Sequence, residues 1–231
     1  MIASPRPLVN TLPMAYHSVY INAIPTFIVD PTIIGKRSVM NFCSHCGGPV
    51  SPQIPAGDDR PRFICQQCHT IHYQNPRMVV GTVPEWDGRI LLCRRAIAPR
   101  AGLWTLPAGY LENGETTMDG ARRETREEAA AELQELTPFA LFDLPFINQV
   151  YLMFRGPLAS TAWRPGRESL EVRLFAEKEL PWEQLAFIVI RETLECYCRD
   201  RSRGGFRLHT GTIAPPAQDI HGRLPSKEGS E

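Results

Sequence analysis

The residues with the clearest chemical potential are the glutamates of the segment 109–131, GYLENGETTMDGARRETREEAAA. Glu124 is followed by Glu127 three residues later and by Glu128 four residues later, and on an α-helix these spacings place all three carboxylates on one flank. Carboxylates held this close repel each other unless a cation offsets their charge, and oxygen ligands are those that hard cations such as Mg²⁺ prefer. The segment therefore predicts a hard-metal site.

A second metal site is predicted by two Cys-x-x-Cys pairs, Cys43 with Cys46 and Cys65 with Cys68, separated by eighteen residues. Each pair can supply two thiolates to one tetrahedral ion, and two pairs at this spacing are typical of a zinc ribbon. Four thiolates leave no open position for a substrate. We therefore expect a structural Zn²⁺ site that acts as scaffold or interaction surface and takes no part in catalysis.

The other cysteines and the histidines beside the ribbon are not expected to bind metal. An odd total of seven cysteines argues against the disulfide framework of a secreted protein and fits a reducing compartment. Cys93, Cys196 and Cys198 have no partner at metal-ligand spacing. His45 and His69 adjoin the cysteine pairs, but four thiolates already fill a tetrahedral shell.

The glutamates need a helix, and the residues before them predict where it begins. Thr116 and Asp119 have capping-box spacing, so a helix is expected to start there. The face that would pack on a sheet is small and mostly apolar, and consists of Met118, Ala121, Thr125 and Ala129. The glutamates fall on the neighbouring flank, where we expect solvent and a metal to reach them.

Short apolar runs predict the strands around this helix. Asp87-Gly88 is a hairpin turn signal between the first two of them. The expected strands are 78–83, 89–95, 139–144, 150–156 and 171–175. An apolar helical pattern predicts a second helix over 181–200, with Pro181 at its start.

Composition bounds the organisation of the chain. A length of 231 residues, with 43% apolar and 22% charged residues, predicts a globular domain of ordinary size plus a small one. We assign residues 40–74 to the ribbon and 75–200 to the main domain. A formal net charge of zero gives no support to a nucleic-acid partner. No uninterrupted apolar run approaches the roughly 18 residues of a membrane span, so no membrane association is expected.

The two ends of the chain differ from its middle. Residues 1–39 are rich in proline and poor in acids, and two interpretations stay open. We favour a leader or disordered extension ahead of Met40, in a cytoplasmic, bacterial-like protein. The alternative is a transit peptide that directs the protein to a plastid. Residues 201–231 are rich in Gly, Ser, Pro and charge, which predicts a largely disordered tail.

The spacing of the acidic segment resembles the Nudix box, the signature of a family of diphosphate hydrolases. The residues that match the family pattern Gly-x5-Glu-x7-Arg-Glu-apolar-x-Glu-Glu-x-Gly-apolar are Gly109, Glu115, Arg123, Glu124, Glu127 and Glu128. The departures are Thr125 for a bulky apolar residue, Ala130 for the glycine, and the small Ala131 at the last position. No carboxylate is lost, so we expect activity to survive. The resemblance covers residues 40–200 and implies the Nudix fold, an α/β/α sandwich of the α/β (α+β) class with a mixed sheet, preceded by the zinc ribbon.

The resemblance also implies roles for the box residues. Mg²⁺, or Mn²⁺ in its place, would bridge diphosphate oxygens and lower the pKa of the attacking water. The metal ligands implied are the backbone carbonyl of Gly109 and the carboxylates of Glu124, Glu127 and Glu128. Arg123 would pair with Glu115 and hold the preceding loop against the helix. The general base stays open between Glu127 in the box and two later residues, Glu168 and Glu171.

The segments around the box narrow the choice of substrate. The ribbon, YQNP at 73–76, MVVG at 78–81 and GLWTLPAGY at 102–110 together resemble a subgroup of ADP-ribose pyrophosphatases and plant plastid FAD pyrophosphatases. This favours ADP-ribose or FAD, each giving AMP and a phosphorylated partner. NADH pyrophosphatases carry a SQPWPFPxS-like segment that residues 143–156, DLPFINQVYLMFRG, lack. An NADH pyrophosphatase is therefore the alternative, with reduced NAD and NAD-capped RNA less favoured.

A different class of function is a non-catalytic module that senses nucleotides. Such modules usually lose one or more glutamates of the box, whereas this chain retains all four. The enzyme interpretation is preferred, with a small-molecule nucleotide as the partner. Many relatives dimerise, so a homodimer is left open by the resemblance.

Overall fold

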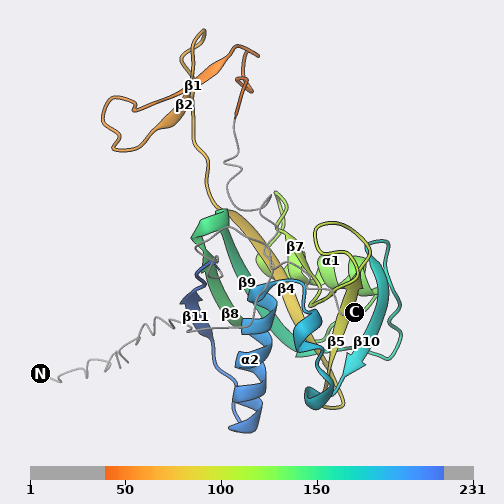
Figure 1. The fold of residues 1–231 in the computed structure, drawn as a ribbon. Helices are drawn as coiled ribbons and strands as arrows, with labels where there is room; N and C mark the ends of the chain where they lie inside the picture. Colours follow the sequence, from red (N-terminus) through yellow and green to blue (C-terminus); the bar gives the residue numbers. More distant parts are fainter. Residues whose placement is uncertain (1–39, 216–231) are drawn as a thin grey trace, which may run out of the picture.

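The computed structural model describes residues 40–215, and Figure 1 shows two parts joined by an extended connection. The smaller part is a sheet of three short antiparallel strands in the order β1-β2-β3. Their bounds are β1 Val50–Gln53, β2 Arg62–Cys65 and β3 Ile71–His72. The proposed domain boundary between residues 74 and 75 falls after β3 and before the first strand of the larger part.

The larger part is built on one eight-stranded sheet. Six strands run in the order β10-β5-β4-β9-β8-β11, while β6 pairs with β5 and β7 pairs with β4. The β4–β9 and β8–β11 pairs are parallel and the others are antiparallel, so the sheet is mixed. The bounds are β4 Arg77–Trp86, β5 Arg89–Arg95, β6 Trp104–Thr105, β7 Ala108–Tyr110, β8 Thr137–Leu144, β9 Gln149–Pro157, β10 Ser169–Phe175 and β11 His209–Thr212.

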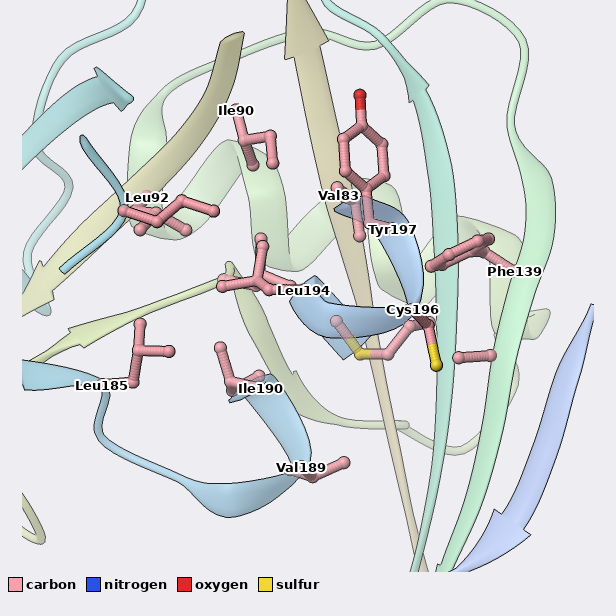
Figure 2. Close-up of a cluster of buried hydrophobic side chains, with 14 of the residues drawn as sticks. Val83, Ile90, Leu92, Phe139, Leu185, Val189, Ile190, Leu194, Cys196 and Tyr197 are labelled. Carbon is pink, nitrogen blue, oxygen red and sulfur yellow. The ribbon is translucent and has the colours of Figure 1, made fainter. Parts of the chain in front are cut away.

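Two helices cover the opposite faces of this sheet, α1 Thr117–Ala129 and α2 Ile188–Ser202. Successive side chains of a strand point to opposite faces. In β4, Val80 accordingly belongs to the same core cluster as Ala121 of α1, whereas Val83 belongs to the cluster that contains Leu194 of α2. Figure 2 shows this second cluster, in which Val83 and Ile90 of the sheet lie beside Leu194 of α2. The predicted α/β/α sandwich with a mixed sheet is confirmed.

All five predicted strands are present, and β5 spans the predicted residues 89–95. The turn before it has positive φ at both central residues, 46° at Asp87 and 70° at Gly88. Such a turn suits the twist of a two-residue hairpin. The strands β6, β7 and β11 were not predicted, because each is at most four residues long and lies in a segment rich in Gly, Pro or charge.

The predicted start of the second helix at Pro181 is wrong. Residues 177–187 instead form two 3₁₀ turns, η2 Glu177–Glu179 and η3 Trp182–Gln184, and α2 begins at Ile188. The tertiary structure explains the difference, since the backbone at Leu185 bridges to Trp104 and the N–H of Ala186 donates to the Trp104 carbonyl at 2.7 Å. This pairing with the sheet keeps the backbone extended at Leu185 and Phe187, immediately before α2 begins.

The prediction of disorder from residue 201 is wrong for residues 201–215. The chain turns after α2 and returns as β11, which pairs in parallel with β8. Asp200 anchors the return, because its Oδ2 lies 2.7 Å from His209 Nε2 and accepts the N–H of Arg207 at 3.0 Å. Asp200 and His209 are both buried, so the anchor lies inside the fold. The rest of the predicted tail, 216–231, lies outside the described residues.

Several expectations are not addressed by the fold. The leader and transit-peptide interpretations concern residues 1–39, which lie outside the described residues. Within residues 40–215, no helix has the length and apolar character needed to cross a membrane. The cytoplasmic location and the homodimer stay predictions.

Candidate active site and zinc ribbon

Helix α1 carries the acidic segment, and its start is set by the predicted cap. Thr116 has extended backbone geometry, and its Oγ1 accepts the N–H of Asp119 at 3.2 Å. This hydrogen bond satisfies one of the N–H groups that lack a partner in the first turn. The helix then runs to Ala129, and the three glutamates lie on one flank as their spacing predicts.

The expectation that solvent reaches all three carboxylates is wrong for two of them. Glu124 and Glu128 are buried, with 8% and 7% of each residue exposed, while Glu127 is exposed. Strand β7 causes the burial, since the N–H of Ala108 donates to Glu128 Oε2 at 3.3 Å. Gly109 lies so close to Glu124 that an added Cβ would collide with the Glu124 carboxylate. A larger residue at position 109 would therefore displace the Glu124 carboxylate.

Arg123 joins three of the four box carboxylates, those of Glu115, Glu124 and Glu127, into one hydrogen-bonded network. Its guanidinium donates to both oxygens of Glu115, at 2.7 and 3.0 Å, and to the carbonyl of Tyr110 at 3.0 Å. It also donates to Glu124 at 2.7 Å and to Glu127 at 3.1 Å. The loop that contains Tyr110 and Glu115 is thus tied to α1. The Arg123 guanidinium lowers the pKa of Glu115 to about 2.

The two buried carboxylates are electrostatically unfavourable in their ionised form. Burial, followed by the negative charge of Glu124, raises the pKa of Glu128 to about 8. Burial also raises the pKa of Glu124, partly offset by Arg123. A nearby cation favours the ionised form of a carboxyl and reverses such a shift. The donor set of hard oxygens and its excess of negative charge therefore fit a divalent cation such as Mg²⁺.

The carboxylates are less tightly gathered than the thiolates of the ribbon. Among residues 40–215, the ribbon cysteines are the one group whose potential metal ligands all lie within 4.8 Å of one another. The Arg123 guanidinium lies among the carboxylates, where one of its nitrogens pairs with both Glu124 and Glu127. Metal binding at the box would exchange these ion pairs for bonds to the metal. The ligand role of the Gly109 carbonyl stays a prediction.

The structure distinguishes between Glu168 and Glu171, the two later residues that the sequence leaves open as general base. The charge of Glu168 contributes to the raised pKa of both Glu124 and Glu128, so its carboxylate lies within electrostatic reach of the box. Glu171 lies on β10 and pairs with Arg94 at 3.8 Å. Glu168 is therefore the better placed of the two.

The three departures from the box pattern are accommodated in different ways. Thr125 is fully buried, and its Oγ1 lies 2.7 Å from Oγ1 of Thr82 on β4. Ala130 ends the helix in the left-handed conformation, with φ 47° and ψ 33°, which is the geometry that favours glycine. Ala131 is buried at 3% exposure. The helix therefore ends at this position although alanine replaces the glycine of the family pattern.

In the ribbon, the four cysteines converge as predicted. The Sγ atoms of Cys43 and Cys68 are 3.6 Å apart, and those of Cys46 and Cys65 are 3.5 Å apart. A disulfide would require about 2.05 Å. A tetrahedral zinc ion with Zn–S bonds of about 2.3 Å places its ligands about 3.8 Å apart. The arrangement therefore fits one zinc ion held by four thiolates.

Two side chains beside the thiolates were missed by the sequence analysis. His72 Nε2 lies 3.2 Å from Cys43 Sγ, and Thr70 Oγ1 lies 3.1 Å from Cys68 Sγ. Donors around a metal site orient its ligands and offset their charge. His72 follows the second cysteine pair by four residues, and β3 is what turns it back toward the first pair. The sequence offers no signal for this approach.

Tyr110 is a further residue near the box that the sequence analysis did not select. Tyr110 directly follows Gly109 in the sequence and is about half exposed. Gln149 donates to its hydroxyl at 2.9 Å, and the guanidinium of Arg77 lies 5.5 Å from the ring centroid. A half-exposed aromatic ring held by such contacts can stack against a planar group of a ligand.

This chain belongs to the Nudix family. Residues 75–194 match the NUDIX domain model, and residues 41–74 match the model of the Nudix N-terminal zinc ribbon. A crystal structure of a NUDIX hydrolase from Nitrosomonas europaea is 54% identical, with a TM-score of 0.72 over 75% of this chain and 99% of that chain. The expected family and fold are thereby confirmed.

Two curated relatives carry more specific names. The NAD-capped RNA hydrolase NudC of Photobacterium profundum is 28% identical over 67% of this chain and 58% of its own length. The mitochondrial NAD(P)H pyrophosphatase NUDT13 of Mus musculus is 28% identical over 62% of this chain and 38% of its own length. The matched region thus spans about half the length or less of these relatives.

Proposed function

We propose that this protein hydrolyses the diphosphate of a nucleoside diphosphate linked to a second group, with a divalent cation as cofactor. The observation that carries the proposal is the arrangement of Glu124, Glu127 and Glu128 on one helix flank, two of them buried with raised pKa values. Repulsion between carboxylates held this close is unfavourable for folding unless a bound cation offsets their charge. Retention of every box glutamate also favours catalysis over nucleotide sensing.

The residues of the chain would divide the work as follows. The carboxylates hold Mg²⁺, which when bound supplies positive charge to the diphosphate and acidifies a coordinated water. Arg123 and Glu115 keep the loop with Gly109 against α1, so that the backbone approaches the carboxylates closely. Glu127, exposed on α1, and Glu168, in the later loop, are the candidates to accept the proton of the attacking water.

We propose an NAD-type dinucleotide as the first substrate to test. Its support is the naming of two relatives, NudC as an NAD-capped RNA hydrolase and NUDT13 as an NAD(P)H pyrophosphatase. This reverses the order expected from sequence, in which ADP-ribose and FAD came first. The half-exposed ring of Tyr110 offers a stacking surface for a nicotinamide or adenine ring.

ADP-ribose and FAD remain the second candidates because of one observation. Residues 143–156 lack the SQPWPFPxS-like segment of the NADH pyrophosphatases. All of these substrates contain adenosine diphosphate, and hydrolysis between the phosphorus atoms gives AMP plus a phosphorylated partner in each case. The chemistry at the glutamates is therefore shared, and the group beyond the diphosphate distinguishes them.

The test is a substrate panel with Mg²⁺. NADH, NAD⁺, ADP-ribose, FAD and an NAD-capped RNA are incubated with the protein, and the products are resolved by chromatography. Hydrolysis releases AMP from the first four substrates, whereas the capped RNA gives nicotinamide mononucleotide and an RNA with a 5′-monophosphate. We expect Glu128→Gln to lower kcat by about 100-fold or more, because a charge that holds the metal is lost. Glu177→Gln, an exposed substitution in η2, is the matched control. Failure on every diphosphate, or a Glu128→Gln variant as active as wild type, would refute the proposal.

A further inference from the structure

The segment between β9 and β10, residues 158–168, follows the end of α1 closely, and we call it the docking loop. Its backbone donates from Arg164 to the carbonyl of Ala129 and from Gly166 to the carbonyl of Glu128, both at 2.9 Å. The last carbonyls of a helix have no partner within the helix. The docking loop therefore satisfies two carbonyls at the end of the helix that carries the glutamates.

Gly166 makes the closest contact of this loop with α1. An added Cβ there would collide with the Glu127 carbonyl oxygen, and it would lie 2.8 Å from Glu127 C and 3.1 Å from Glu128 C. These are backbone atoms of a helix and cannot rotate aside as a flexible side chain would. Any larger residue at this position must move the loop away from α1.

The far end of the loop is held as firmly, and Glu168 lies there. The carbonyl of Glu168 accepts the N–H of Ala96 at 2.8 Å, and the N–H of Ser169 donates to the Gly166 carbonyl at 3.2 Å. Ser169 then pairs with Arg95 as β10 begins. Glu168 is thus fixed between the end of β5 and the contact made by Gly166.

We propose that Gly166 is a positioning residue for the hydrolysis, since its missing side chain lets the docking loop seat on α1 and so sets the position of Glu168, two residues further on, relative to that helix. The role rests on the proposed function. Gly166 acts through Glu168 and touches neither substrate nor metal. Glu168 in turn acts on the reaction only when the loop is seated.

A double-mutant cycle tests this coupling. We expect Gly166→Ala to lower kcat by about 10- to 100-fold with little change in KM, because a shift of about 1 Å in a catalytic group has an effect of this size. Glu168→Gln should also lower kcat. In the double variant, the alanine should cause no further loss, since the group that it misplaces is already absent.

The control is Gly205→Ala, because a Cβ at Gly205 meets nothing within 4 Å. Trp163→Ala is a second way to loosen the loop if Gly166→Ala folds poorly, because the Trp163 ring packs edge-on against Trp86 at 6.2 Å. Its loss of kcat should likewise depend on Glu168. Hydrogen exchange should show weaker protection of residues 158–168 in Gly166→Ala than in Glu168→Gln.

The outcomes separate the two proposals. If wild type hydrolyses no diphosphate, the proposed function fails and the positioning role fails with it. If wild type is active but Gly166→Ala retains its kcat, or lowers kcat by the same factor with and without Glu168, only the positioning role is refuted. A fall in kcat that disappears in the Glu168→Gln background supports it.

Discussion

The hydrogen bond between the buried hydroxyls of Thr82 and Thr125 should be measurable in a double-mutant cycle of the free energy of unfolding. Both residues are fully buried, and their Oγ1 atoms lie 2.7 Å apart between β4 and α1. Thr125 also donates to the carbonyl of Ala121 at 2.9 Å. Because its one proton is engaged there, Thr82 must donate to Thr125. The two hydroxyls therefore have different roles in the pair.

This asymmetry sets the magnitude of each change. In Thr125→Val, the Thr82 hydroxyl loses its acceptor inside the core, and an unpaired buried donor costs about 1–3 kcal/mol. In Thr82→Val, Thr125 keeps its bond to Ala121 and loses only an incoming donor, so we expect about 1 kcal/mol. The double valine variant removes both groups and should lie within about 1 kcal/mol of wild type, since the replacement keeps the shape and leaves no orphaned hydroxyl.

Urea unfolding at constant zinc and magnesium measures the cycle. The midpoint should fall most for Thr125→Val and recover in the double variant, with an unchanged m-value that shows the same surface exposed on unfolding. The ribbon is a separate part, so the transition of the larger domain is followed through tryptophan fluorescence. Additive losses in the double variant would refute the assigned hydroxyl pair.

Three other predictions follow from the site. Without metal, the free energy of unfolding should fall as pH rises from 4.5 to about 8, because Glu128 in the folded protein keeps a proton that the unfolded chain releases. The loss is up to about 5 kcal/mol. Melting temperatures of wild type and Glu128→Gln that depend on pH in the same way would contradict it. Ala130→Gly should raise the free energy of unfolding by about 0.5–1 kcal/mol in urea titrations. Glycine removes the strain of the left-handed conformation, and the greater backbone entropy of glycine in the unfolded chain offsets part of this gain. A destabilised variant would contradict the cap geometry. His72→Ala should lower the affinity for zinc about 10- to 100-fold in chelator competition, because the hydrogen bond from His72 to Cys43 is lost. His45→Ala is the control. Equal zinc affinities of the two variants would exclude this role of His72.

Features encoded within a few residues were predictable. The spacing of three and four residues puts the glutamates on one flank of any α-helix, and Thr116 caps that helix wherever it packs. Two cysteine pairs converge because one tetrahedral ion needs four thiolates. The turn at Asp87-Gly88 likewise needs no partner outside its own hairpin.

Features that depend on distant segments were not predictable. The second helix begins late because Trp104 pairs with Leu185, about eighty residues further along the chain. Residues 209–212 form a strand because β8 offers a free edge and Asp200 anchors His209. Local composition at these places favours a helix and a disordered tail, and tertiary contacts override both preferences.

The sequence by itself determined which groups are available: three carboxylates on one helix flank, an arginine immediately before them, and four thiolates in the ribbon. Only the tertiary structure decided their state. Burial against strand β7 raises the pKa values of Glu124 and Glu128, and the docking loop, which ends at Glu168, packs on the end of α1. The reason is physical: helical periodicity acts over neighbouring residues, whereas burial and charge proximity depend on segments that meet only when the sheet has formed.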